Sequence, residues 1–410
     1  MGLVDDQPHR WPVPLQALEH RSFRTLWLAI FVSNAGSWMQ RVATAWIVYT
    51  MSESAMWLGI DAALTGLPTL LLLPLAGVLA DRVDRRVVLS ITNLVNALLA
   101  VALAVLWWSN SLTIWELLSV SFLSGVVAAF AAPASQSLIP TAAGEDHIPT
   151  AVALNSFQYN VARAIGPAVG GLALTGLGAG WCFLLNALSF LGVLGAVVLQ
   201  PTVPPVNAVK PSIPDSLRQG LAFIRDRKDV RHLLMLVTLL AFGGAPMVTL
   251  LPAVAKTLLH EQAGTYAGLL AVFGVGAALS GILLTFYRPG QHVKITIVAI
   301  IIVVGICHTS IALTTDKMLA LIITFVAGLA FVGAMIELGT GLLSSTPDTL
   351  RGRVSGIQQL CFRVAQPVGC VVGALLTEYA SIQTAFVAFG IVLVLGASLV
   401  MFTHSRELHA

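Results

Sequence analysis

Twelve long apolar segments, separated by short polar ones, constrain this chain more than any other feature of its sequence. A bilayer core of about 30 Å is crossed by roughly 20 helical residues, and the segments reach about that length. Hydrophobic residues make up 57% of the chain and charged residues only 10%, so a water-soluble fold could not bury the apolar surface. We therefore expect an all-α membrane protein with twelve transmembrane helices. The expected spans are residues 24–50, 57–80, 87–108, 112–133, 150–176, 181–200, 232–255, 264–287, 293–313, 318–345, 354–378 and 382–402.

The distribution of arginine and lysine predicts the orientation of the chain. With the N-terminus inside, the inner segments hold 17 of these residues, and the outer loops hold only Lys256 and Lys317. Because basic residues collect on the cytoplasmic side, we expect both termini in the cytoplasm and the chain in a bacterial inner membrane. The first apolar run is too long for a cleaved signal peptide, so we expect it to be retained.

The longest polar segment, residues 201–231, divides the expected spans into two groups of six. It begins rich in proline and continues as an amphipathic basic helix, which we expect to lie on the inner leaflet as a cytoplasmic linker. A shift of 200 residues aligns three identical pairs in the fifth and eleventh spans: Gln158 with Gln358, Arg163 with Arg363 and Pro167 with Pro367. We therefore predict two parallel six-helix bundles, residues 1–200 and 232–410, with a substrate site between them.

The loop between the second and third spans combines a glycine, an aspartate and three arginines: Gly77, Asp81, Arg82, Arg85 and Arg86. Gly77 permits a close helix approach near the inner interface. Asp81 suits a helix N-terminus, whose partial positive charge favours a carboxylate by about 0.3–1 kcal/mol. A plain positive-inside cluster would explain the arginines, but it would not require Gly77 and Asp81 at this spacing. The glycine and the aspartate therefore indicate a specific contact, and the resemblance described below implies that this loop is a gating motif.

Five charged residues lie deep inside the expected spans, away from their ends: Arg41, Asp61, Arg163, Glu337 and Arg363. A charge at the bilayer centre costs at least ~2.5 kcal/mol, so such residues usually face an internal cavity and have a function. Arg41 shares one helix face with Asn34 and Ser37, and this polar face is expected to point inward. Arg41 and Asp61 lie at similar depths. They either form a pair that holds an outer gate, or Asp61 takes part in proton coupling.

Glu337 is the only acidic residue deep in the spans of the second half. It either carries a proton or packs against Arg363. Arg163 and Arg363 either hold an anionic group of the substrate or each bind a neighbouring carboxylate. His308 is read as a packed core histidine. Asp61 and Glu337 are thus the candidates for proton coupling, and the three arginines, with Asn34 and Ser37, are the candidates for a substrate or charge-pair cavity.

The segment GVLADRVDRR, residues 77–86, resembles the signature loop of the major facilitator superfamily. Further stretches resemble its drug and siderophore exporter branch, which is enterobactin-exporter-like and macrolide-efflux-like: SWMQR from Ser37, PASQSLIP, RAIGPAVGG from Arg163, NALSF and RGRV from Arg351. The resemblance covers essentially the whole chain. It implies two six-helix bundles, alternating access, and a contact of Asp81 with the start of the eleventh span near Val354. Ser37 stands where many members of this branch carry an acidic residue.

These features together predict a proton-coupled secondary exporter of drugs or siderophores. An uptake permease or a facilitator of lipid-like solutes would have the same fold, and a membrane sensor without transport is a further alternative. The sequence holds no P-loop, HExxH or GxSxG motif, so no ATPase, metalloprotease or hydrolase is indicated. We expect no enzyme activity, cofactor, bound metal or nucleic-acid partner. The expected partners are the substrate, protons and membrane lipid, and the expected state is a monomer.

Overall fold

Helices account for nearly all of the computed structural model, which describes residues 13–200, 213–286 and 293–408. The α-helices are α1 (Arg21–Ser52), α2 (Ala55–Arg82), α3 (Arg85–Trp108), α4 (Ile114–Ala142), α5 (Ile148–Gly176), α6 (Ala179–Val198), α7 (Ile213–Asp226), α8 (Lys228–Ala253), α9 (Ala263–Phe286), α10 (Val293–Ala312), α11 (Lys317–Ser344), α12 (Arg351–Tyr379) and α13 (Ile382–Leu408). Two short 3₁₀ helices, η1 (Val13–Glu19) and η2 (Glu145–His147), and a π-helical turn, η3 (Val254–Leu258), complete the described elements.

Several helices begin directly after a residue whose side chain caps their N-terminal end. The Ser54 hydroxyl accepts the backbone N–H of Met56 at the start of α2. The Asp84 carboxylate caps α3 in the same way, and Asp316 caps α11 by accepting the N–H of Leu319. Such caps satisfy backbone donors that have no partner within the helix. These caps fix where each helix begins and therefore where the short turn before it ends.

Ten of the described helices are long and apolar enough to cross a membrane, judged by length and composition alone. They are α2, α3, α4, α6 and α8 to α13. The remaining long helices, α1 and α5, have 32 and 29 residues, but each has polar residues and an arginine, Arg41 or Arg163, in its middle. These two pack against each other. The all-helical architecture is therefore confirmed, whereas the count of twelve spans stays a prediction.

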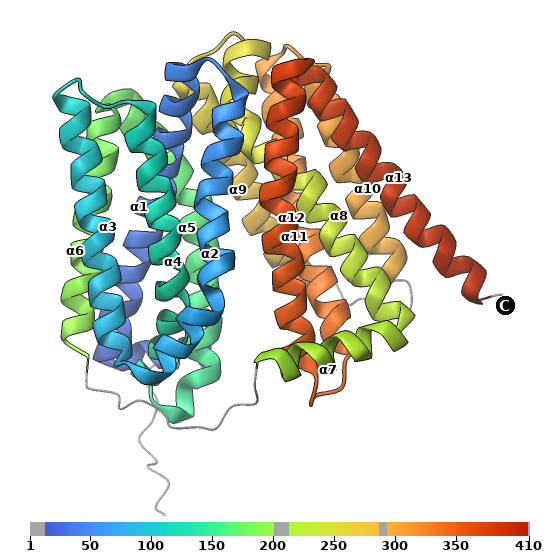
Figure 1. Cartoon of the computed structure of the whole chain (residues 1–410), viewed down its shortest axis with the longest axis horizontal. Helices are drawn as coiled ribbons and strands as arrows, with labels where there is room; N and C mark the ends of the chain where they lie inside the picture. The colour runs from blue at the N-terminus through green and yellow to red at the C-terminus, as the bar shows by residue number, and fades with distance from the viewer. Residues whose placement is uncertain (1–12, 201–212, 287–292, 409–410) are drawn as a thin grey trace, which may run out of the picture.

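The contacts divide the long helices into two groups, which lie side by side in Figure 1. One group holds α1 to α6 and the other holds α8 to α13. They meet mainly through α2 against α12 and through α5 against α9. The division falls at the segment predicted to be a linker. Its proline-rich part, residues 201–212, lies outside the described residues, so the boundaries at 200 and 232 stay predictions.

Glycines bring equivalent helices together in each group. On α5, Gly166 and Gly170 lie directly against α1, and on α12, Gly369 and Gly373 lie directly against α8. The four-residue spacing places both glycines of a pair on one face, which is the pattern by which membrane helices approach closely. Because α1 and α5 hold the same positions in the first group as α8 and α12 in the second, the same contact occurs twice. This recurrence supports the predicted internal repeat.

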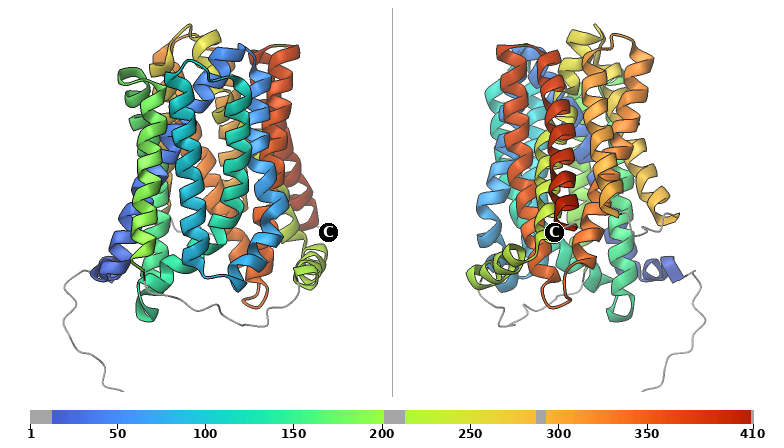
Figure 2. Two further views of the ribbon diagram at one scale, coloured as in Figure 1. Left: turned by 60° about the vertical axis from the view of Figure 1, so that its left-hand side comes forward. Right: turned by 90° about the vertical axis from the view of Figure 1, so that its right-hand side faces the viewer.

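The basic segments of the chain gather at one end of the molecule. Figure 2 shows the start of α1, the turn between α2 and α3, and α7 at this end, which we call the basic end. α7 packs on α12 there, because Gly220 lies against Ile357 and Arg353. On α7, Ile224 is buried and Leu221 is exposed, so only part of the apolar face remains for the leaflet.

Site-directed labelling tests the predicted orientation. Lys228 begins α8 at the basic end, whereas Ser54 and Lys317 lie at the start of α2 and α11, at the opposite end. In a cysteine-free background, cysteines at Ser54 and Lys317 should react with an impermeant maleimide added to intact cells. A cysteine at Lys228 should react only after the cells are permeabilised. Labelling of Lys228 from outside would reverse the orientation.

Candidate functional site

One tryptophan of α1 joins two of the predicted site arginines. The guanidinium carbons of Arg41 and Arg163 lie 4.7 Å and 5.7 Å from the centroid of the Trp38 ring. Trp38 and Arg41 share a face of α1, since they are three residues apart. Arg163 reaches the same ring from α5, because Gly166 and Gly170 hold α5 directly against α1. We call Trp38, Arg41, Tyr159 and Arg163 the Trp38 cluster.

The polar face of α1 continues from this cluster through hydrogen bonds. The Asn34 amide donates to Gln158 Oε1 at 3.2 Å, and the Gln158 amide donates to Asn155 at 3.0 Å. Next to this face, the Asn186 amide donates to Gln40 Oε1 at 2.7 Å and ties α6 to α1. Ser37 is half-buried, and no hydrogen bond of its side chain is seen among the described residues. The hydrogen bond of Asn34 to α5 supports the prediction that this face of α1 points toward other helices.

Asp61 lies on α2, beside α1 and near the second helix group. It accepts a short hydrogen bond from the Ser121 hydroxyl of α4. Arg41 of α1 and Tyr266 of α9 are both within electrostatic range of its carboxylate. Among the described residues, no ion pair joins Arg41 to Asp61. Arg41 and Asp61 therefore interact only through their electrostatic fields and do not touch.

Glu337 lies deep in the second group. It is 4% exposed, and its Oε2 atom has no hydrogen-bond partner among the described residues. Its neighbours on the same face, Gly333 and Gly341, lie against Ser280 of α9 and against Leu233 of α8. This face therefore points into the second group, and no ion pair or hydrogen bond joins Glu337 to Arg363 among the described residues. Within the described residues, Arg363 of α12 has no ion pair.

The predicted gating motif lies at the basic end. The guanidinium of Arg86 donates to Gln200 O at 2.6 Å and to Asp84 Oδ2 at 3.2 Å, which ties the start of α3 to the end of α6. Arg82 is exposed and Arg85 is half-buried. The predicted motif does not include Asp84, although an aspartate just before a helix is a cap signal. Arg86 is thus an anchor within the first group.

The register of α2 against α12 places the acidic residue of this motif. Gly59 lies against Ala374, and Gly66 lies against Pro367, so the two helices run antiparallel. If the same register continued to the end of α2, Asp81 would come opposite Gly352 in the first turn of α12, but a Cβ atom placed at Gly352 meets no described neighbour within 4 Å in this structure. The surroundings of Gly77 and the side chain of Asp81 lie outside the described part of the chain. The predicted contact of Asp81 near Val354 therefore stays a prediction, which the register supports.

Contacts between the two helix groups collect at the end opposite the basic end. Lys256 Nζ donates to Glu53 Oε1 at 3.1 Å, and the Ser54 hydroxyl donates to Glu378 Oε2 at 2.7 Å. Gly171 of α5 lies directly against Ala267 of α9. We call these three the opposite-end contacts.

An ion pair within the second group lies near these contacts. Lys317 donates to Glu261 Oε1 at 3.3 Å, and this hydrogen bond holds the pKa of Glu261 below its ordinary value.

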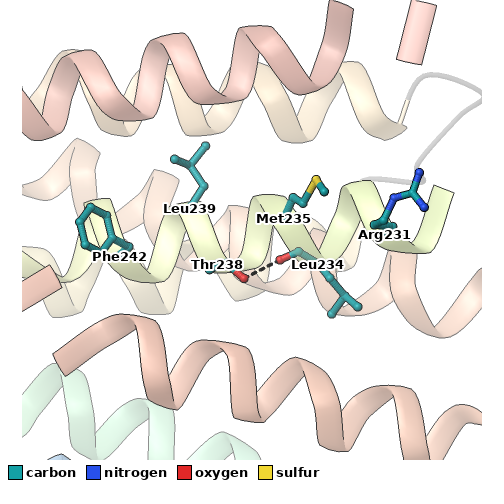
Figure 3. A pocket seen from close by; sticks show the side chains of 6 residues that line it. All are labelled: Arg231, Leu234, Met235, Thr238, Leu239 and Phe242. Carbon is teal, nitrogen blue, oxygen red and sulfur yellow. Dashed lines mark hydrogen bonds between the residues drawn. The ribbon is translucent and has the colours of Figure 1, made fainter. Parts of the chain in front are cut away.

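A shallow apolar groove of about 440 Å³ runs along α8 (Figure 3). It is lined by Arg231, Leu234, Met235, Thr238, Leu239 and Phe242. The Thr238 hydroxyl donates to the backbone carbonyl of Leu234 and so is already satisfied. None of the predicted site residues lines this groove. The candidate site is therefore the Trp38 cluster with Asp61, and separately Glu337.

Comparisons with known proteins agree with this architecture. The family model described as transmembrane secretion effector matches residues 13–410. Macrolide efflux protein A of Streptococcus pyogenes is 25% identical over 91% of this chain and 93% of its own. The enterobactin exporter EntS of Escherichia coli is 25% identical over 94% of this chain and 92% of its own. The crystal structure of the nucleoside transporter NupG superposes with a TM-score of 0.74 at 15% identity, covering 93% of this chain and 98% of that one.

The sequence resemblance is thereby confirmed over nearly the whole length. The solved structure shares the fold at low identity, and the relatives are named as efflux proteins and exporters. This chain is a multi-pass membrane transporter and belongs to the transmembrane secretion effector family of the major facilitator superfamily.

Proposed function

We propose that this transporter exports small molecules, drugs or siderophores, from the cytoplasm in exchange for protons. The observation that carries the proposal is the position of Arg41, Asp61 and Arg163 on α1, α2 and α5. α2 and α5 are the helices through which the first group meets the second. The electrostatic surroundings of charged residues on these helices change when the two groups move relative to one another. A proton on Asp61 would remove the attraction between Asp61 and Arg41, which couples protonation to movement.

Glu337 is the second candidate for the coupling proton. Burying a carboxylate without a partner is costly in the ionised form, and a bound proton removes that cost. An intramembrane acid of this kind is by default a candidate for proton transfer. Asp61 lies toward the opposite-end contacts, and Glu337 lies toward the basic end of α11. A proton could therefore use either site at a different stage of the cycle.

The opposite-end contacts support alternating access. If the basic end faces the cytoplasm, these contacts close the outer side of the protein, and the conformation faces inward. Export would then require them to separate while α2 and α12 come together at the basic end. Asp81 and the first turn of α12 would form such a contact if the register of α2 against α12 continued to this end. The two states would exchange by rocking of two bundles, residues 1–200 and 232–410, joined by the linker at 201–231.

The remaining features of the proposal follow from the same arrangement. Twelve spans, with α1 and α5 included, would place both termini in the cytoplasm of a bacterial cell and the protein in its inner membrane. The partners would be the substrate, protons and lipid, without a nucleic acid. The protein would act as a monomer and not as an enzyme.

Accumulation measurements test the direction and the substrate class. A strain that lacks this gene, complemented with the wild-type gene or an empty plasmid, would be given a radiolabelled macrolide and, in iron-limited medium, a catecholate siderophore. Cells with the protein should hold less of at least one compound, and a protonophore should remove the difference. Greater accumulation in cells with the protein would identify uptake and contradict the proposed direction.

Substitution of Asp81 tests the gating motif in the same assay. Asp81→Asn should lower export about tenfold per molecule with little change in the amount of membrane protein, because it weakens a charge–dipole contact formed in only one state. Asp146→Asn is the matched control, since Asp146 is exposed on η2 and should tolerate the change. A loss of protein abundance with normal export per molecule would assign Asp81 a structural role.

A further inference from the structure

The Trp38 cluster holds two positive charges on one aromatic ring. The guanidinium groups of Arg41 and Arg163 both lie within about 6 Å of the Trp38 centroid, the range of a cation–π contact. The two guanidinium groups are close enough to repel one another. A ring quadrupole attracts each cation weakly and does not neutralise either. The cluster is therefore an electropositive site in which no carboxylate among the described residues forms an ion pair with either arginine.

Neither guanidinium has a hydrogen-bond acceptor or an ion-pair partner in the part of the chain that the structure describes. A guanidinium carries several N–H donors, and arginines in membrane spans normally pair with carboxylates or backbone carbonyls. Asp61 is the carboxylate within electrostatic range of Arg41, and it is hydrogen-bonded to Ser121 instead. As far as the described residues show, the N–H donors of both guanidinium groups are open to another molecule.

The cluster is also accessible. Arg41 is exposed, whereas the next residues along α1, Val42 and Ala43, are buried. Arg41 and Arg163 lie over the same Trp38 ring, and Asp61 of α2 is within electrostatic range of Arg41; α2 and α5 are the helices that contact the second group. A ligand between the two groups would meet both arginines.

We propose that the Trp38 cluster recognises the acid group of an amphiphilic organic carboxylate, which is therefore the substrate class of this transporter. Two guanidinium forks match the oxygens of a carboxylate, and their planes stack on aromatic rings. A lipophilic cation would be repelled by both arginines. That the bound carboxylate is the transported substrate rests on the proposed function. The binding itself can be measured without transport.

The sign of the charge agrees with export. A membrane potential that is negative inside drives an anion outward, so the exit of a carboxylate is favoured in an energised cell. Asp61 and a bound carboxylate would both be attracted to Arg41, so they oppose one another. Removing the charge of Asp61 should therefore strengthen the binding of an anion.

Calorimetric titration of the purified protein in detergent tests the proposal with three matched probes. These are 1-naphthoate, the neutral 1-naphthamide and the cationic 1-naphthylmethylammonium. The wild-type protein should bind naphthoate at least about tenfold more tightly than naphthamide, because charged hydrogen bonds to two guanidinium groups are lost in the amide. The cation should bind more weakly still.

Variants then assign this preference to the cluster. Arg163→Gln should lower the affinity for naphthoate about tenfold and leave that for naphthamide unchanged, which also shows that the protein is folded. Arg163→Lys should retain part of the preference. Arg218→Gln, which removes an arginine of α7 outside the cluster, is the charge-matched control and should change nothing. Asp61→Asn should tighten naphthoate binding.

Three results would overturn the proposal: equal affinities of the wild-type protein for naphthoate and naphthamide, the same loss in Arg218→Gln as in Arg163→Gln, or weaker naphthoate binding by Asp61→Asn. Because no gradient or membrane is present, these outcomes are independent of whether the protein exports its substrate. Export without any preference for the carboxylate would retain the proposed function and reject this inference.

Discussion

Replacing Glu337 with glutamine is expected to abolish uphill export and to preserve substrate binding and downhill exchange. Glutamine resembles the protonated acid in size and polarity but cannot release a proton. The site is 4% exposed and leaves Oε2 without a partner among the described residues, so a change of protonation has a large effect on its local free energy. In proteoliposomes with an imposed pH gradient, uphill transport should fall to the level of liposomes without protein. Counterflow of labelled substrate should persist.

Glu116→Gln is the matched control for this experiment. Glu116 lies in the first turn of α4, where it accepts a hydrogen bond from the backbone N–H of Thr113 at the protein surface. Its replacement should leave uphill transport intact. Full uphill transport by Glu337→Gln would exclude Glu337 from coupling and leave Asp61 as the proton site. Loss of binding as well as transport would show that Glu337 shapes the substrate site itself.

The apolar runs predict most helices well, because a bilayer sets both their length and their composition. The expected span 318–345 corresponds to α11, and 382–402 lies within α13. The largest error is in α4, whose expected end is residue 133 and which continues to Ala142 through Pro133 and Pro140. The expected boundary falls at a proline, but membrane helices tolerate proline where neighbouring groups satisfy the freed backbone carbonyl.

The side-chain contacts of the candidate site are less predictable, because they depend on how each helix is rotated. Of the two readings of Glu337, packing against Arg363 requires that its face of α11 meets α12. In the structure, Gly339 is the residue of α11 near Gln358 of α12, and Glu337 points to another side. Periodicity along one helix defines its faces but does not say which neighbour each face meets.

The position of Arg41 and Arg163 over Trp38 also depends on how the helices are rotated, which the sequence does not give. The sequence marks both arginines as unusual, because each lies within an expected membrane span. It does not tell whether Trp38 lies at the membrane interface or lines a cavity. The contact arises because Gly166 and Gly170 fix the rotation of α5 against α1. A glycine spacing of this kind predicts a close approach, but the partner helix becomes known only from the structure.

Replacing Gly171 with leucine is expected to prevent closure of the end opposite the basic end. A Cβ atom at this position would overlap the methyl group of Ala267 on α9, and leucine adds further carbon atoms beyond it. The contact joins the two helix groups, so the strain is relieved by their separation without repacking of either group. We expect transport per molecule to fall at least about tenfold, since a state that faces inward would require this contact to form. A cysteine at Thr175, next to Gly264, should react faster with an impermeant maleimide in the variant.

Two further leucine substitutions separate gating from folding. Gly192 of α6 faces open space, so Gly192→Leu should leave transport and labelling unchanged. Gly328 of α11 lies directly against the backbone of Phe273 on α9 within the second group, so Gly328→Leu should reduce the amount of folded protein. Gly171→Leu should resemble neither, because it should remain folded while its labelling rises and its transport falls. If it instead lost folded protein to the same extent as Gly328→Leu, the contact between α5 and α9 would be permanent packing, and the movement of the two groups would have to occur about this contact.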